Sequence, residues 1–289
     1  MIPTENSELN TEQLAHFERE GYVILRGVLE PQVVAEAREA IAEMVEAVAH
    51  ERAALQKSAL HADAPFETRY LEIFREHPAD VPFGFRPELH KAGMFGLFFH
   101  PRILHAAEQI LGPELRLYPN YTVRPKLPDH AGTLVPWHQD SGFTEAHHKA
   151  DDAEGSADDL RMVNLWTAFV PATRENGCMQ FVPGSHTSGT VGHEDKGRYI
   201  EIEERFLAPV QDKIIDVELD PGDVVMFSNL LFHRGQPNVS KTIRWSCDWR
   251  YQDATQPTLR PETGHLARSQ AHPEKVIHHA AQWAQESFK

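Results

Sequence analysis

Short apolar segments separated by turn residues occupy the chain from Leu115 onward, and this pattern constrains the fold most. The candidate strands are Leu115–Arg124, Met162–Val170, Cys178–Val182, Lys213–Leu219, Val224–Ser228 and Thr242–Trp249. An Asn-Gly turn at Asn176-Gly177 and a Pro-Gly turn at Pro221-Gly222 lie between them. Short strands at regular spacing with such turns predict a mainly β core, built as a double-sheet barrel or jelly roll.

The first third of the chain has helical patterns instead. Asn10 or Thr11 begins a short helix that ends near Gly21, and Tyr22–Leu25 follows as a strand. Pro31 starts a second helix, with apolar residues at helical spacing beyond it, and a third helix spans Pro101–Leu111. We predict one domain over residues 1–289. It has a mostly helical flank at 1–112, a β-barrel core at 113–252 and a C-terminal extension with a helix at 253–289.

Composition excludes several classes of protein. The chain has 43 Asp and Glu against 28 Lys and Arg, so it lacks the basic footprint of a nucleic-acid partner. It has no run of 18 apolar residues, so we expect no membrane span. The two cysteines, Cys178 and Cys247, form no metal-binding pair and indicate a reducing compartment. We expect a cytoplasmic protein that acts on a small molecule, and make no prediction of its oligomeric state.

Histidine is frequent in this chain, so a metal motif needs context. Three of the 18 His begin a His-x-Asp tripeptide: His61/Asp63, His138/Asp140 and His193/Asp195. Most such pairs are solvated neighbours. Only His138 and Asp140 follow an apolar, strand-like stretch, in which alternate side chains leave the same face and reach one ion. The other two pairs lie in polar or Gly-rich segments, so we select His138 and Asp140.

A third ligand must come from a distant strand. His233 ends the apolar run Leu230–Phe232, where an isolated histidine is more often a core residue. Two imidazoles and one carboxylate, however, form the facial triad of a non-heme Fe(II) oxygenase, which leaves positions on the metal open. His138, Asp140 and His233 are therefore the predicted iron ligands and catalytic centre.

Arg244 supports this prediction because it lies in an otherwise apolar candidate strand. A buried arginine is costly unless it is paired, and its guanidinium matches a carboxylate with two hydrogen bonds. If residues 235–241 form a hairpin turn, His233 and Arg244 lie on neighbouring strands and hold the two ends of a dicarboxylate. The alternative is a surface arginine that pairs with Asp248 or Glu218.

A polar insertion at residues 147–159 separates the His138 motif from the Met162 strand. We expect a mobile, solvated loop here. A lid over the active site is the alternative, because the insertion leaves directly from the metal motif.

Together, the ordered motifs resemble the phytanoyl-CoA dioxygenase family of Fe(II)/2-oxoglutarate oxygenases. They are Trp-His-Gln-Asp at 137–140, Leu-Trp-Thr-Ala at 165–168, Asn-Gly-Cys-Met at 176–179, Pro-Gly-Ser-His at 183–186, and His233 with Arg244. The resemblance implies a double-stranded β-helix, iron bound by the three predicted ligands, and Arg244 paired with 2-oxoglutarate. It also implies a reaction in which O₂ and 2-oxoglutarate oxidise an aliphatic C–H bond of a small molecule and release succinate and CO₂.

The resemblance also implies further contacts with the cosubstrate. Trp166 is placed beside 2-oxoglutarate, Asn120 faces the same pocket, and Lys91 aligns loosely with a lysine that contacts the cosubstrate. One departure stands out: the family often has a serine two residues after the distal histidine, and here that residue is Gly235. Ser246 or Thr122 would then have to supply the hydroxyl that assists Arg244.

Two other functions fit parts of the pattern. A non-catalytic barrel that binds or senses a small ligand would keep the fold without the chemistry. A cupin-like metalloenzyme would use the metal ligands but not 2-oxoglutarate, and it would leave Arg244 without a role.

Overall fold

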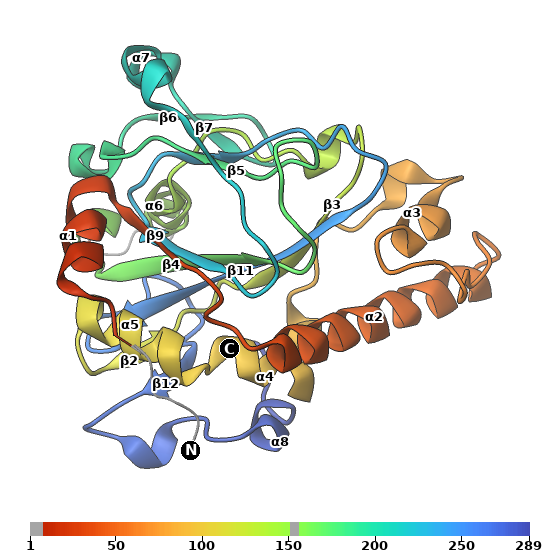
Figure 1. Cartoon of the computed structure of the whole chain (residues 1–289), viewed down its shortest axis with the longest axis horizontal. Helices are drawn as coiled ribbons and strands as arrows, with labels where there is room; N and C mark the ends of the chain where they lie inside the picture. The colour runs from red at the N-terminus through yellow and green to blue at the C-terminus, as the bar shows by residue number, and fades with distance from the viewer. Residues whose placement is uncertain (1–7, 151–155) are drawn as a thin grey trace.

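The computed structural model describes residues 8–150 and 156–289, and its core is a pair of facing antiparallel sheets (Figure 1). The larger sheet contains seven strands in the order β1-β9-β4-β11-β2-β12, with β3 paired to β11. Their bounds are β1 Tyr22–Leu25, β2 Leu115–Leu117, β3 Thr122–Lys126, β4 Met162–Ala168, β9 Val224–Ser228, β11 Arg244–Asp253 and β12 His265–Arg268. The smaller sheet has the order β10-β5-β8, from β5 Met179–Phe181, β8 Ile215–Val217 and β10 His233–Gly235. A separate hairpin joins β6 His193–Asp195 to β7 Ile200–Ile202. The predicted double-stranded β-helix is confirmed.

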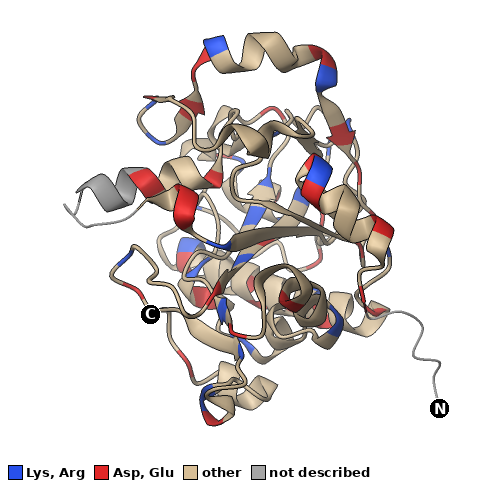
Figure 2. Ribbon diagram, turned by 90° about the vertical axis from the view of Figure 1, so that its left-hand side faces the viewer, with Lys and Arg blue, Asp and Glu red and all other residues tan. Residues whose placement is uncertain are grey.

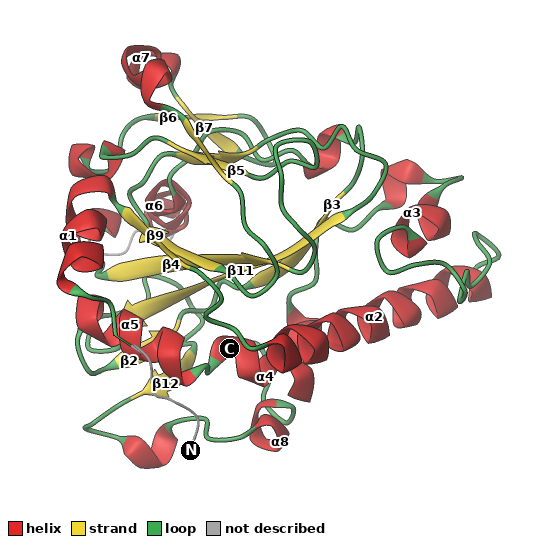
Figure 3. Ribbon diagram, in the orientation of Figure 1, coloured by secondary structure: helices red, strands yellow, loops and turns green. Residues whose placement is uncertain are grey.

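Helices cover the outer face of the larger sheet (Figure 3). They are α1 Thr11–Glu20, α2 Pro31–Ala54, α3 Arg69–Phe74, α4 Ala92–Phe98, α5 Pro101–Leu111 and α8 Ala280–Trp283. Two other helices, α6 Asp140–Ala150 and α7 Glu204–Leu207, do not belong to this layer. Short 3-10 turns occur at Pro78–Asp80, Pro87–Leu89, Ala131–Thr133, Ala157–Asp159, Ser185–Ser188, Ala208–Lys213 and Pro273–Lys275. In the described part of the chain, no helix has both the length and the apolar character needed to cross a bilayer.

The predicted helix ends are correct because their capping residues act locally. Asn10 accepts a hydrogen bond from the backbone of Gln13 in a capping box, and α1 stops at Gly21 with φ +82°. Pro31 and Pro101 occupy the first turns of α2 and α5, where a missing N–H costs nothing. These helices supply the apolar layer that covers the larger sheet.

Strand β11 divides its side chains strictly between two environments. Trp245, Cys247, Trp249 and Tyr251 belong to the main hydrophobic core, which the helices complete. Arg244, Ser246, Asp248 and Arg250 alternate with them and line a cavity between the sheets. Lys and Arg positions along the strands in the middle of the molecule are visible in Figure 2. The inner face of β11 is therefore polar, which indicates a binding site rather than a packed core along this strand.

Two predicted strand features are wrong. The expected strand at Leu115–Arg124 is split into β2 and β3, because Pro119 cannot donate to a ladder. The expected hairpin at 235–241 does not form either, since β10 pairs with β5 in the smaller sheet. The chain crosses from the smaller sheet to the larger one between β10 and β11. Asn238 holds this connection in place by donating hydrogen bonds to the carbonyls of Lys126 and Thr242, both at 2.8 Å. His233 and Arg244 therefore belong to opposite sheets, not to neighbouring strands.

The region after the metal motif also differs from expectation. Helix α6 begins at Asp140 itself, so the polar insertion starts as a helix rather than as a loop. Residues 151–155, on which the lid hypothesis largely depends, lie outside the described residues. The C-terminal extension contributes β12 to the larger sheet and ends with α8, whose Trp283 is fully buried.

Candidate metal centre

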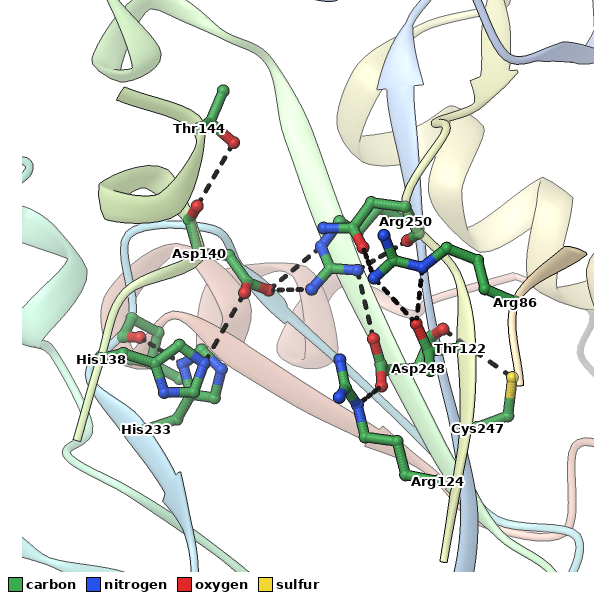
Figure 4. Close-up of polar contacts among 12 residues, drawn as sticks. Arg86, Thr122, Arg124, His138, Asp140, Thr144, His233, Cys247, Asp248 and Arg250 are labelled. Atoms are coloured by element: carbon green, nitrogen blue, oxygen red, sulfur yellow. Dashed lines mark hydrogen bonds and ion pairs between the residues drawn. The ribbon is translucent and has the colours of Figure 1, made fainter. Parts of the chain in front are cut away.

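The structure brings His138, Asp140 and His233 together between the two sheets. Their ligand atoms all lie within 4.8 Å of one another. Nε2 of His138 is 3.7 Å from Oδ1 of Asp140, and the two imidazole centroids are 4.0 Å apart (Figure 4). Among the side chains that the structure describes, those of residues 8–145 and 156–289, no other three His, Cys, Asp or Glu cluster in this way. The pairs at His61 and His193 thus form no comparable site there.

Main-chain hydrogen bonds hold the two histidines together. The backbones of His138 and His233 pair in both directions, with N···O distances of 2.9 and 3.0 Å. Nδ1 of His138 lies 2.9 Å from the carbonyl of Pro136, and Nδ1 of His233 lies 2.8 Å from that of Leu231. A carbonyl only accepts, so each Nδ1 carries the proton and each Nε2 keeps its lone pair for a metal.

Burial keeps both histidines neutral. Burial and, to a smaller extent, the neighbouring His233 lower the pKa of His138 to about 3, although Asp140 acts in the opposite direction. Burial also lowers the pKa of His233. Metal ligation requires neutral imidazole, so two neutral Nε2 atoms and one carboxylate fit Fe(II) as a facial set.

Arg250 fixes the orientation of Asp140. Its Nε and Nη2 atoms donate to Oδ2 at 3.1 and 2.7 Å, which leaves Oδ1 on the side of the histidines (Figure 4). Burial alone would raise the pKa of Asp140, but the charge of Arg250 lowers it below the usual range. The sequence analysis missed Arg250. The signal was its spacing, since it lies on the same face of β11 as Arg244.

A buried charge network continues from Arg250 along the inner face of the sheet. Asp248 accepts from Arg250 at 3.2 Å and from Arg124 at 2.6 Å. Arg86 donates to Asn120 and to Thr122, both at 3.2 Å. The network occupies Asp248 and the Thr122 hydroxyl, so neither is left to pair with Arg244.

Arg244 lies in the same cavity without a carboxylate partner. It is only 5% exposed, and its Nη1 donates to Ser246 Oγ at 2.5 Å. Its guanidinium carbon is 5.0 Å from the ring centroid of Trp166. Within the described ranges it takes part in no ion pair, and its Nε has no hydrogen-bond partner. Burial lowers its pKa to about 10. Of the two hydroxyl groups considered from the sequence, that of Ser246 contacts Arg244, and the burial of Arg244 excludes a surface position.

A cavity of about 220 Å³ connects most of the predicted site residues. Its lining contains the three metal ligands, Arg244, Trp166 and Asn120. Lys91 is not brought to it. That residue precedes α4 and forms an ion pair with Glu43 at 2.8 Å.

Gln139 holds the segment that carries His138 and Asp140 in place. Its side-chain amide donates to the carbonyls of Gly189 and Leu230 at 2.8 and 2.6 Å. Its backbone N–H donates to Nε2 of His193 at 3.3 Å. His193 therefore supports the segment and is not a ligand.

The chain is similar in sequence and in fold to known proteins. The model of the phytanoyl-CoA dioxygenase family matches residues 17–246. The chain is 26% identical over 252 residues to 1-deoxypentalenic acid 11-beta-hydroxylase of Streptomyces arenae, covering 83% of this chain and 80% of that protein. It resembles the structure of EctD from S. alaskensis with 2-oxoglutarate and 5-hydroxyectoine, with a TM-score of 0.59, 18% identity, and coverage of 99% and 87% of the two chains. It also resembles the epimerase SnoN in complex with Fe³⁺, alpha ketoglutarate and nogalamycin RO, with a TM-score of 0.55, 25% identity, and 86% of each chain covered.

The chain therefore belongs to the phytanoyl-CoA dioxygenase family. It is a non-heme iron dioxygenase that depends on 2-oxoglutarate and O₂.

Proposed function

We propose that His138, Asp140 and His233 hold the Fe(II) of this dioxygenase, and that Arg244 binds the far carboxylate of 2-oxoglutarate. The observation that carries the assignment is a buried guanidinium that has no anionic partner among the described side chains and lies in the cavity that contains the triad. A desolvated cation of this kind is costly until an anion arrives. A dicarboxylate that reaches from the metal to Arg244 supplies that anion.

Each residue then has a defined task. The two Nε2 atoms and Oδ1 of Asp140 supply one face of ligands, Arg250 holds the carboxylate, and Ser246 and Trp166 orient Arg244. Asn120 lies at the cavity wall beside Arg86. When bound, iron supplies the oxidative decarboxylation of 2-oxoglutarate to succinate and CO₂, coupled to oxidation of an aliphatic C–H bond. The protein orients the reactants and excludes water.

Anaerobic titration of the Fe(II)-loaded protein with 2-oxoglutarate tests these roles. We expect a visible charge-transfer band that disappears in Asp140→Ala and in Arg244→Ala. His61→Asn is the control: it removes an imidazole of a rejected pair and tolerates the φ of +48° at that position. Absence of the band in folded, iron-loaded wild type would favour a non-catalytic barrel or a cupin-like enzyme without 2-oxoglutarate.

We further propose that the substrate is a small organic molecule with an anionic group. Phe83, Arg86, Arg198 and Tyr199 line the same cavity, so apolar rings and cations occur together. Among the residues described, the Arg86 guanidinium donates only to the neutral groups of Asn120 and Thr122. The hydroxylase relative from S. arenae is named for an acid substrate, which agrees with this chemistry.

Succinate release in the presence of candidate compounds tests the substrate class. Carboxylic acids should stimulate release more than their amides of matched shape, and Arg86→Met should reduce the difference. Equal stimulation by acid and amide would contradict the proposal.

We also propose that the enzyme works in the cytoplasm. Cys178 and Cys247 are buried free thiols, as is usual in a reducing compartment. Fractionation of cells that produce the protein at native level, followed by immunodetection, tests this; recovery outside the cytoplasmic fraction would contradict it.

A further inference from the structure

A second cation lies beside Arg244, on the inner face of the larger sheet. Lys126 in β3 pairs directly with Arg244 in β11, so their side chains project from the same face. Both line the cavity, and they are 3% and 5% exposed. Like charges placed directly opposite each other across a strand pair are destabilising. Their burial together therefore requires a reason.

The protein supplies little to offset the charge of Lys126. Its Nζ donates to the carbonyl of Thr133 at 3.2 Å, and it forms no ion pair in the described part of the chain. Burial, together with the smaller effects of the charges of Arg244, Arg124 and Arg234, lowers its pKa to about 6. Among the described residues, Nζ of Lys126 donates only to Thr133 and the neighbouring guanidinium forms no ion pair. An incoming anion favours the protonated form of Lys126, so the two side chains together form a site for an anion.

Two glycines make room for the Lys126 side chain. A Cβ atom on Gly235, in the opposite sheet, would lie 3.1 Å from Nζ. A Cβ atom on Gly177 would lie 2.6 Å from Cε. The ammonium therefore occupies the space that a side chain at position 235 would fill. This accounts for the glycine two residues after His233, at the same end of the cavity as Arg244.

We infer that Lys126 is the second cation for the far carboxylate of 2-oxoglutarate, acting with Arg244, and that Gly235 is small so that the ammonium reaches this point. The inference rests on the proposed function. Two cations at this carboxylate also select for a dianion, so 2-oxo acids without the second carboxylate are excluded. Lys126 is thus a determinant of cosubstrate specificity.

Binding measurements on Lys126→Met test the inference. The Mn(II)-loaded protein is titrated anaerobically with 2-oxoglutarate by calorimetry, so the readout does not depend on turnover. Loss of a charge-assisted hydrogen bond should raise the Kd for 2-oxoglutarate roughly 10- to 100-fold. The Kd for Mn(II) should stay unchanged. The preference for 2-oxoglutarate over 2-oxobutyrate should fall by a similar factor.

Controls separate the possible failures. Lys91→Met removes a lysine outside the cavity and should bind 2-oxoglutarate like wild type. Lys126→Gln replaces Met if that variant does not fold. Wild type that fails to bind 2-oxoglutarate would refute the proposed function, whereas equal affinity in wild type and in a folded Lys126 variant would overturn this inference alone.

Discussion

Arg250 donates two hydrogen bonds to Oδ2 of Asp140, from Nε at 3.1 Å and from Nη2 at 2.7 Å. The carboxylate consequently presents its other oxygen to the histidines. The same guanidinium donates to the backbone carbonyl of Asn120 at 2.6 Å. These hydrogen bonds fix the position of the metal ligand Asp140 relative to the larger sheet.

Replacing Arg250 with Met should weaken metal binding. Groups that orient a ligand typically account for about 10- to 100-fold in affinity, and Mn(II) titration measures this. Removing one partner of a buried ion pair should also lower the free energy of unfolding of the apoprotein by about 3–5 kcal/mol. Arg161→Met is the control, because the Arg161–Asp253 pair lies near the surface. Unchanged metal affinity in Arg250→Met would show that Asp140 does not need this contact.

Metal affinity should be nearly independent of pH in the mildly acidic range. An ordinary histidine titrates near pH 6.5 and loses affinity roughly tenfold per pH unit below that. Burial lowers the pKa of His138 to about 3 and also lowers that of His233. Both shifts weaken the competition of protons for these ligands between about pH 5.5 and 7.5 while the protein is folded, so affinity should fall by much less than tenfold per pH unit. Co(II) titrations across that range, with circular dichroism to verify folding, measure the effect; a steep loss of affinity would contradict it.

Lys126→Met should make the apoprotein more stable even as it weakens cosubstrate binding. Burial of Lys126 costs free energy whether the amine stays charged or gives up its proton, and replacing buried ionic groups with apolar side chains often gains about 1–4 kcal/mol. The folded pKa is about 6 and the unfolded value is 10.5, so the unfolded chain binds more protons between these limits. The stability of wild type should therefore rise with pH across this window relative to Lys126→Met. Urea unfolding at pH 7 and pH 9 measures the difference in free energy of unfolding between Lys126→Met and wild type. This difference must be smaller at pH 9.

Binding of 2-oxoglutarate should take up a proton. At pH 7.5 Lys126 is mostly neutral because its pKa is about 6, and an incoming carboxylate favours the charged form. Besides burial, the charges of Arg244, Arg124, Arg234 and Cys178 act on Lys126. The pKa of Arg244, about 10, and that of Cys178, about 11, lie well above this pH. Calorimetry in phosphate and in Tris buffers should give different apparent enthalpies for wild type and equal ones for Lys126→Met. Identical enthalpies in both buffers for wild type would contradict proton uptake.

The sequence was sufficient to predict the parts of the site that depend on local motifs. His138 and Asp140 share one short segment, and His233 and Arg244 each end or begin a recognisable strand. The structure brings all four residues to one cavity. Arg250 could also have been predicted from the sequence, because it lies six residues after Arg244 in one strand and the odd-numbered residues between them are apolar.

The remaining features depend on contacts that no local pattern reveals. The pairing of Lys126 with Arg244 is a matter of register between β3 and β11. The crossing from β10 to the other sheet depends on hydrogen bonds from Asn238 to distant carbonyls. Lys91 lies before a short helix in the flank, where spacing relative to the metal motif places no constraint on position.

The paired backbones of His138 and His233 have a consequence for metal supply. Their mutual hydrogen bonds join main-chain atoms, so the ligand frame is built by the fold and not by the ion. Ligands that the fold positions without a metal can bind any divalent ion that accepts two imidazoles and a carboxylate. Fe(II) binds such ligands more weakly than several other divalent ions do. Which ion the protein carries is then decided by which ions are available to it. Protein purified in the presence of nickel or copper will hold those metals until they are chelated and iron is restored.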